Sequence, residues 1–115
     1  MVDVGPERFE ELVADALDEL PEPLTRAMDN VVVLVEDRHG EEPDLLGIYE
    51  GVALTERYSD YGGVLPDRIT LYRLALADVC ADEDELREEV AVTVVHEIAH
   101  HFGIDEATLH RLGWG

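Results

Sequence analysis

The first predicted element is an amphipathic helix over residues 7–20. Apolar residues recur there at intervals of three and four, which places them on one face of a helix. The members of this stripe are Phe9, Leu12, Val13, Ala16, Leu17 and Leu20. Pro21 and Pro23 follow, and we expect them to end the helix because proline has no backbone N–H to continue its hydrogen bonds. A short helical turn is expected after them, as far as Met28.

Three short segments are predicted strands. Residues 31–35 are apolar and almost all β-branched, which is the composition of a buried strand. Residues 46–49 form a second candidate. Residues 68–73 alternate between polar or charged side chains and apolar ones, which suits a half-exposed strand. This pattern fits both a sheet edge that binds an extended peptide and an ordinary structural strand.

The longest predicted helix begins after Asp82 and ends before Gly103. Its buried face is marked by apolar residues that repeat every four positions, namely Leu86, Val90, Val94 and Ile98. Asp82 and Glu85 have the spacing of a capping pair, and Gly103 stands where a C-terminal glycine is typical. A short helix over residues 106–112 is expected to follow. Together these elements predict an α+β fold in a single domain, residues 1–115.

The chain is strongly acidic. Its 28 acidic residues and eight basic residues, all of them arginine, give a formal net charge of −20 at pH 7. Such a charge repels phosphate backbones, so nucleic acid is not an expected partner. It favours a solvated surface and attracts cations, including zinc, and substrates with basic residues.

Membrane insertion and secretion are not expected. No apolar run approaches the roughly 18 residues of a membrane-spanning helix, and the N-terminal residues contain neither a basic region nor an apolar signal core. The single cysteine, Cys80, cannot form an internal disulfide. It is expected to pack as a small side chain and fits a reducing compartment. A cytoplasmic location is therefore predicted.

The segment from His96 to His100 has the spacing HExxH and lies within the long predicted helix. Because a helical turn takes 3.6 residues, the two histidines lie about one turn apart on the same face and can bind one zinc ion together. Glu97 is rotated by about 100° from His96. It can therefore lie beside the metal ion and accept a proton from water without being a ligand.

A catalytic zinc site needs three protein ligands and one position open to water. In the longer zinc signature, the third ligand comes ten residues after the first histidine, beyond a glycine. Here that glycine is Gly103 and the third position is Glu106, which is the predicted ligand. Asp105 is the second choice, since it also has the position of a cap for the last short helix. His110 is a third candidate with a longer reach.

The other histidines and the tyrosines have less defined roles. His101 points about 100° away from its neighbour His100, which favours a packing role or one behind the metal ligands. His39 lies in a polar turn and is expected at the surface. The tyrosines are candidates to donate a hydrogen bond to a developing oxyanion, and the pattern selects none among Tyr49, Tyr58, Tyr61 and Tyr72.

Most of the chain resembles a family of small bacterial zincin-like metallopeptidases. The resemblance rests on YGGVLPDRITLY at residues 61–72, HEIAHHFGID at 96–105, LGIYEG at 46–51 and an opening helix like FEELV at 9–13. It implies a minimal zincin-like fold, with a small sheet, an N-terminal helix and a zinc site on the HExxH helix, and it implies peptidase activity. The chain departs from larger zincins because it has no third histidine in the signature and no methionine after it.

The sequence therefore predicts a minimal zinc metallopeptidase that acts on a peptide or protein substrate. Zinc would bind His96, His100 and Glu106, and Glu97 would be the catalytic base. Two other functions remain open. One is a zinc-binding or protein-interaction module that keeps the scaffold without turnover, and the other is an acidic protein that masks a basic partner. Zinc content and peptide cleavage distinguish these three functions.

Overall fold

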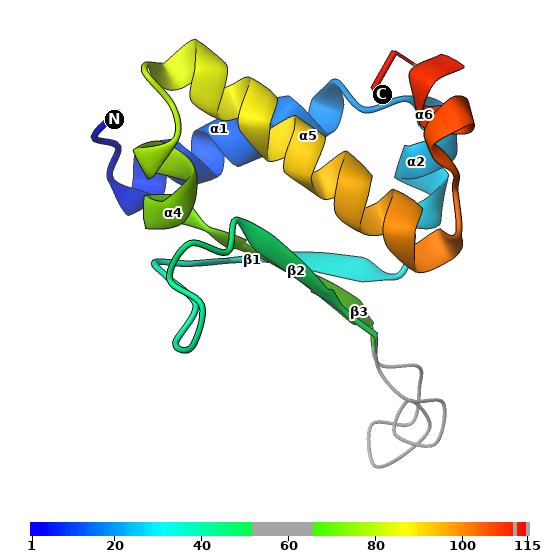
Figure 1. Ribbon diagram of the computed structural model, residues 1–115, viewed down its shortest axis with the longest axis horizontal. Helices are drawn as coiled ribbons and strands as arrows, with labels where there is room; N and C mark the ends of the chain where they lie inside the picture. Colours follow the sequence, from blue (N-terminus) through cyan, green and yellow to red (C-terminus); the bar gives the residue numbers. More distant parts are fainter. Residues whose placement is uncertain (52–65, 112, 115) are drawn as a thin grey trace.

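A three-stranded mixed sheet carries the long helices on one face (Figure 1). The structure, a computed structural model, describes residues 1–51, 66–111 and 113–114. Its elements, in chain order, are α1 (Pro6–Asp18), α2 (Glu22–Ala27), β1 (Val31–Glu36), β2 (Gly47–Glu50), β3 (Asp67–Tyr72), α4 (Arg73–Asp78), α5 (Glu83–Phe102) and α6 (Glu106–Arg111). The expected α+β class is confirmed.

The last strand in the chain, β3, lies at the centre of the sheet. The strand order is β1-β3-β2, with β1 parallel to β3 and β2 antiparallel to it. The prediction of a half-exposed strand here was wrong, because every residue of β3 except Arg68 is buried. Its two sides are already paired, so the alternative in which this strand offers an edge to a peptide was also wrong. The edges in the described sheet are β1 and β2.

The edge strand β1 is more exposed than its amino-acid composition predicts. Val32 and Leu34 are 41% and 43% exposed, whereas Val33 and Val35 face α1 and are half-buried. The prediction of a fully buried strand was wrong because valine and leucine occupy both faces. With no polar residue to mark the open face, the sequence shows no alternation.

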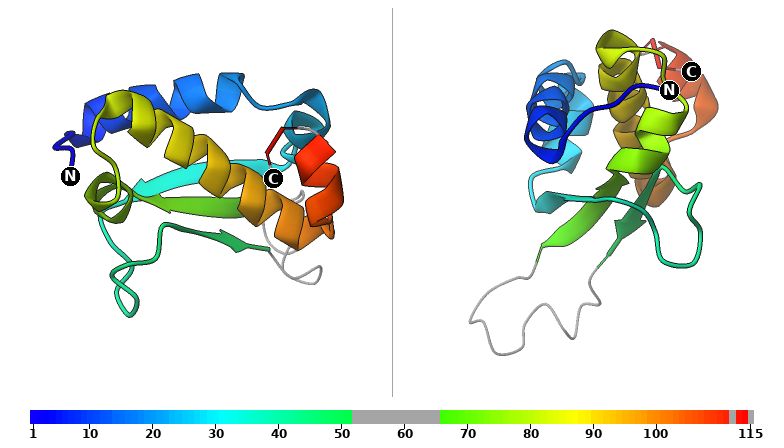
Figure 2. Two further views of the ribbon diagram at one scale, coloured as in Figure 1. Left: turned by 45° about the horizontal axis from the view of Figure 1, so that its top comes forward. Right: turned by 90° about the vertical axis from the view of Figure 1, so that its left-hand side faces the viewer.

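The core lies between the sheet and the two long helices, α1 and α5, which run side by side (Figure 2). Phe9 and Leu12 from α1 are buried, as the apolar stripe predicts, and so are Leu86 and Val94 from α5. Burying one such side chain contributes about 1.5–3 kcal/mol relative to leaving it in water. The packing of α5 therefore fixes the helix that carries the HExxH residues.

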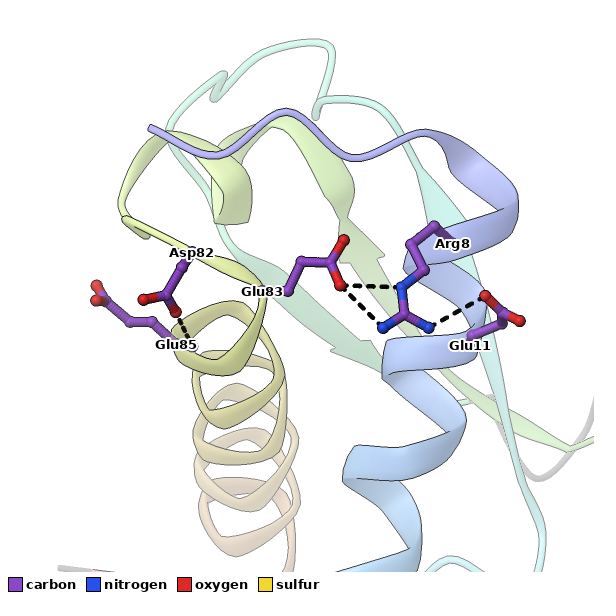
Figure 3. Close-up of polar contacts among 5 residues, drawn as sticks. All are labelled: Arg8, Glu11, Asp82, Glu83 and Glu85. Carbon is purple, nitrogen blue, oxygen red and sulfur yellow. Dashed lines mark hydrogen bonds and ion pairs between the residues drawn. The ribbon is translucent and has the colours of Figure 1, made fainter.

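Arg8 joins the beginnings of α1 and α5. Its Nη2 atom lies 2.8 Å from Oε1 of Glu83, and its Nη1 atom lies 3.2 Å from Oε1 of Glu11 (Figure 3). All three side chains are largely exposed, so the contacts are worth little in stability. They do help to define where the first turn of α5 sits on α1.

Both predicted ends of α5 are confirmed. Asp82 Oδ1 accepts a hydrogen bond from the Glu85 backbone N–H at 2.8 Å (Figure 3). At the other end, Gly103 has a φ of 71°, a left-handed conformation that favours glycine. The Ile104 N–H donates to the Ala99 carbonyl at 2.8 Å and closes the helix. The twenty-residue helix is thus fixed at both ends.

Other boundaries differ from the predictions by a few residues. The first helix ends at Asp18, two residues before its expected end, although Leu20 is still buried. The helical turn after Pro21 is α2. The predicted strand through Arg73 is too long by one residue, because α4 starts there and was not predicted. The final helix is α6, and Leu112 lies outside the described residues.

Cys80 packs as predicted, after α4 and before α5. Its side chain is buried, and burial raises the pKa of its thiol to about 11. In the part of the chain that the structure describes, no helix is both long enough and apolar enough to cross a membrane.

Candidate metal centre

The two histidines of the motif lie on the exposed face of α5, in its last two turns. Both line a hollow of about 400 Å³ at the C-terminal end of the helix. Glu97 lines the same hollow, and so do Asp105 and Glu106 from the segment that follows α5. The fold therefore brings the five predicted site residues to one cavity.

The two candidate third ligands differ in what already holds them. Asp105 Oδ1 accepts a hydrogen bond from the Thr108 backbone N–H at 2.8 Å, which makes Asp105 the cap of α6. This hydrogen bond lowers the pKa of the Asp105 carboxyl. Glu106, the first residue of α6, is exposed and lies at the wall of the hollow. The described residues that line this hollow do not include His110.

The donor types around the hollow suit zinc. Two imidazoles and a carboxylate are a common protein ligand set for a hydrolytic zinc ion. Among the residues that the structure describes, no three His, Cys, Asp or Glu side chains converge closely enough to hold a metal ion. The chemistry of the set therefore fits, and a bound ion would have to bring its ligands closer together than they lie here.

The segment after α6 returns to the motif helix. The Trp114 N–H donates to the Leu109 carbonyl at 2.8 Å, which folds the chain back. Nε2 of His96 then lies 3.4 Å from the backbone carbonyl oxygen of Trp114. One ring nitrogen of His96 is therefore next to a main-chain acceptor.

Glu97 is held by the edge of the sheet. Its Oε1 atom accepts a hydrogen bond from the backbone N–H of Tyr49 in β2 at 3.0 Å. The contact requires β2 to lie very close to α5, and Gly47 makes this possible. A Cβ atom at residue 47 would lie 2.9 Å from Cγ2 of Thr93 and 3.1 Å from the Thr70 carbonyl oxygen. Glycine at this position thus brings a backbone donor within reach of the predicted base.

A second polar group lies beside this contact, and the sequence pattern does not reveal it. The Tyr49 hydroxyl donates to Asp67 Oδ2 at 2.6 Å, and the Tyr49 ring stacks on His101 with 3.9 Å between ring centroids. His101 thus packs against the sheet, next to the helix face that carries His96 and His100. Asp67 begins a strand 30 residues before Glu97, and no spacing rule links the two. Two weaker signals exist: Tyr49 is one of four candidate tyrosines, and Asp67 lies in the segment 61–72 that resembles the family.

The remaining tyrosines and His39, whose roles the sequence did not define, either do not line the 400 Å³ hollow or lie outside the residues that the structure describes. Tyr72 is buried, and burial raises the pKa of its hydroxyl. Its ring and the His39 ring pack in a T shape with 5.6 Å between centroids. His39 lies in a polar turn as predicted and is partly exposed, and its Nδ1 accepts the backbone N–H groups of residues 41 and 42. Tyr58 and Tyr61 lie outside the described residues.

Carboxylates surround the motif on its other sides. A hollow of about 520 Å³ beside His96 is lined partly by Glu19, Glu85, Glu88 and Glu89. Another, of about 350 Å³, lies between α5 and the chain entering β2, and it includes Asp44 and Glu89. The local field therefore has the sign that attracts cations.

The α+β fold agrees with the family that the sequence resembles. The profile of the zincin-like metallopeptidases matches residues 28–114, so the chain belongs to that family. A solved structure of a conserved hypothetical protein from Thermus thermophilus is similar, with 27% sequence identity and a TM-score of 0.59. The match covers 86% of this chain and 94% of the other. Among proteins with curated descriptions, none matches significantly.

Proposed function

We propose that this protein is a zinc-dependent metallopeptidase, with zinc held by His96, His100 and Glu106. The observation that carries the proposal is the placement of Glu97. It lines the same hollow as the two histidines, and the backbone of an edge strand holds one of its oxygens. A metal-binding module has no need of an oriented carboxylate between its histidines. Membership in the zincin-like metallopeptidase family supports the same function.

Zinc, when bound, would supply a Lewis acid that polarises the peptide carbonyl and makes water more acidic. The side chains of the protein would perform the proton transfers. Glu97 would take a proton from the attacking water and then deliver it to the leaving amine. Since the Tyr49 N–H holds Oε1, the transfer would use Oε2.

The substrate backbone would lie along β2. This strand is an edge of the described sheet and runs next to α5, and the 350 Å³ hollow between them is lined by Gly47, Thr93, His96 and Glu97. An extended peptide can bind such an edge as an added strand. The carboxylates of Asp44 and Glu89 in this hollow would favour peptides with basic side chains.

The test compares zinc binding with turnover. Wild-type protein should bind about one zinc ion and cleave members of a broad peptide library that includes basic sequences. Glu97→Gln should bind zinc with near-normal affinity and lose at least about 100-fold in cleavage rate, the lower range for loss of a general base. Asp84→Asn is the matched control, because it also changes a carboxylate to its amide, at an exposed position near the start of the same helix.

Equal cleavage by Glu97→Gln would exclude Glu97 as the base. Zinc binding by a wild-type protein that cleaves no peptide would instead identify a zinc-binding module on a peptidase scaffold. A protein that binds no zinc and is recovered with a basic partner would identify an acidic masking protein.

A further inference from the structure

Asp67 is a buried carboxylate outside the predicted ligand set. It is the first residue of β3 and is only 6% exposed. Its Oδ2 atom accepts the Tyr49 hydroxyl at 2.6 Å, a length typical of a charge-assisted hydrogen bond. Nε2 of His101 lies 3.9 Å from the same oxygen. Asp67 thus holds an aromatic side chain of β2 from the central strand.

Tyr49 connects Asp67 to Glu97. Its hydroxyl is bound by Asp67, its ring stacks on His101 at an interplanar angle of 23°, and its backbone N–H donates to Glu97. Gly51 leaves room for this stack, because a Cβ atom there would lie 3.2 Å from Cε1 of His101. One residue therefore links the central strand, the end of α5 and the predicted base.

The direction of the Tyr49 N–H is not set by pairing with β3. Hydrogen-bonded pairs alternate along an antiparallel ladder. The Tyr72 N–H donates to the Leu46 carbonyl at 3.0 Å, so residue 49 falls in a pair without such bonds. Its N–H points to the outer edge of β2, where it meets Glu97. Pairing with β3 holds the neighbours of residue 49, and the anchored Tyr49 side chain is a further contact that acts on residue 49 itself.

We propose that Asp67 is a positioning residue for Glu97 and acts through Tyr49. The inference rests on the proposed function, because only there is Glu97 a base. Asp67 does not touch the reacting atoms. By holding the Tyr49 hydroxyl it fixes the peptide group that binds Oε1 of Glu97, and a preorganised base needs less rearrangement during proton transfer.

Amide hydrogen exchange at residue 49, followed by NMR in metal-free protein, tests the proposal without a substrate. An outward N–H on an edge strand exchanges quickly unless a side chain binds it. Glu97→Ala gives the exchange rate of the residue 49 amide when its hydrogen bond to Glu97 is absent. Tyr49→Phe removes only the hydroxyl, Asp67→Ala removes the acceptor, and Asp67→Asn keeps an acceptor of similar size. Glu50→Ala is the matched control on β2, since it removes an exposed carboxylate that pairs with Arg68.

We expect exchange at residue 49 to be about five- to tenfold faster in Tyr49→Phe and Asp67→Ala, the effect of losing roughly one hydrogen bond. The amides of residues 48 and 50 should change much less. Asp67→Asn and Glu50→Ala should stay close to wild type after correction for local sequence. Should Asp67→Ala fail to fold, Tyr49→Phe decides the question alone.

Unchanged exchange at residue 49 in a folded Tyr49→Phe protein would overturn the proposal. So would equal acceleration at residues 48, 49 and 50, which would indicate a general loosening of β2. If residue 49 exchanges as fast in Asp67→Asn as in Asp67→Ala, the hydrogen bond between Tyr49 and residue 67 is not the cause of the slow exchange. Failure of the wild type to bind zinc would remove the proposed function and leave these exchange results unaffected.

Discussion

Nε2 of His96 and the backbone carbonyl oxygen of Trp114 lie 3.4 Å apart. For this contact to be a hydrogen bond, Nε2 must carry the proton, because a carbonyl oxygen can only accept. A nitrogen that ligates zinc must instead present its lone pair. Zinc binding through Nε2 is therefore incompatible with the hydrogen bond, and the chain around Trp114 should respond to the metal.

The single tryptophan, Trp114, should thus report zinc binding through its fluorescence. We expect the emission to change with added zinc and to saturate at about one ion per chain. His96→Ala and His100→Ala should each remove the response at micromolar zinc, whereas His39→Ala should retain it. An unchanged response in the double alanine variant of residues 96 and 100 would place the zinc elsewhere.

Glu106→Ala and Asp105→Ala should have opposite effects. Glu106→Ala should weaken zinc binding strongly and leave α6 intact. Asp105→Ala should retain most zinc binding but destabilise α6, because the Thr108 N–H loses its acceptor. Isothermal titration measures the first effect and amide exchange in residues 106–111 measures the second. Loss of zinc in Asp105→Ala alone would make Asp105 the ligand.

The capping role of Asp105 also predicts a pH dependence. The Thr108 N–H holds the pKa of this carboxyl below its usual value. The stabilisation of α6 should therefore be complete above the ordinary aspartate pKa and should disappear as the pH falls through the lowered one. Exchange protection in α6 of wild type, but not of Asp105→Ala, should follow this course.

Gly47→Ala should destabilise the protein by about 1–3 kcal/mol, as expected for overpacking. The new methyl group would meet Cγ2 of Thr93 at 2.9 Å and the Thr70 carbonyl at 3.1 Å. Thr93→Ser removes the first contact and should restore part of the loss. Gly40→Ala, which meets nothing within 4 Å, is the control for urea denaturation. Equal stability of the two alanine variants would show that β2 can move away from α5 at little cost.

Salt should stabilise the fold. With a formal net charge of −20, the folded chain concentrates negative charge, and raising ionic strength from 0.1 to 1 M shortens the Debye length from about 10 to about 3 Å. We expect a rise in Tm of at least about 4 °C, which is roughly 1 kcal/mol for a domain of this size. Sodium and potassium chloride should act equally, since screening depends on ionic strength. A constant or falling Tm would contradict this expectation.

The sequence predicts α5 well because its signals are local. Asp82 and Gly103 mark its ends, and a four-residue apolar repeat marks its buried face. The strands are predicted less well for two physical reasons. The valines of β1 give no contrast between faces, and strand order is not encoded in any local pattern, so the central place of β3 could not be seen.

The candidate site also contains residues that a local sequence pattern predicts and residues that only the tertiary fold brings together. The HExxH spacing selects His96, Glu97 and His100 directly from helical geometry. Asp67 and Tyr49 reach Glu97 only through pairing between strands that are distant in sequence, so periodicity within one element cannot find them. The sequence therefore singles out the candidate residues that share the helix, offers Tyr49 only as one of four candidate tyrosines and does not indicate a role for Asp67.

The central place of β3 also has a consequence for the order of folding. Val31 lies opposite Asp67, and Gly47 lies opposite Leu71. Neither edge strand can therefore pair until β3, which is synthesised later, is available. Until then, residues 31–35 form an apolar, uncharged run of the kind that associates between chains, with Asn30 and Glu36 as its polar flanks. When β3 folds between them, β1 and β2 both become paired, and Asp67 comes into contact with Tyr49. Formation of the contact between Asp67 and Tyr49 thus coincides with protection of an apolar segment that could otherwise associate between nascent chains.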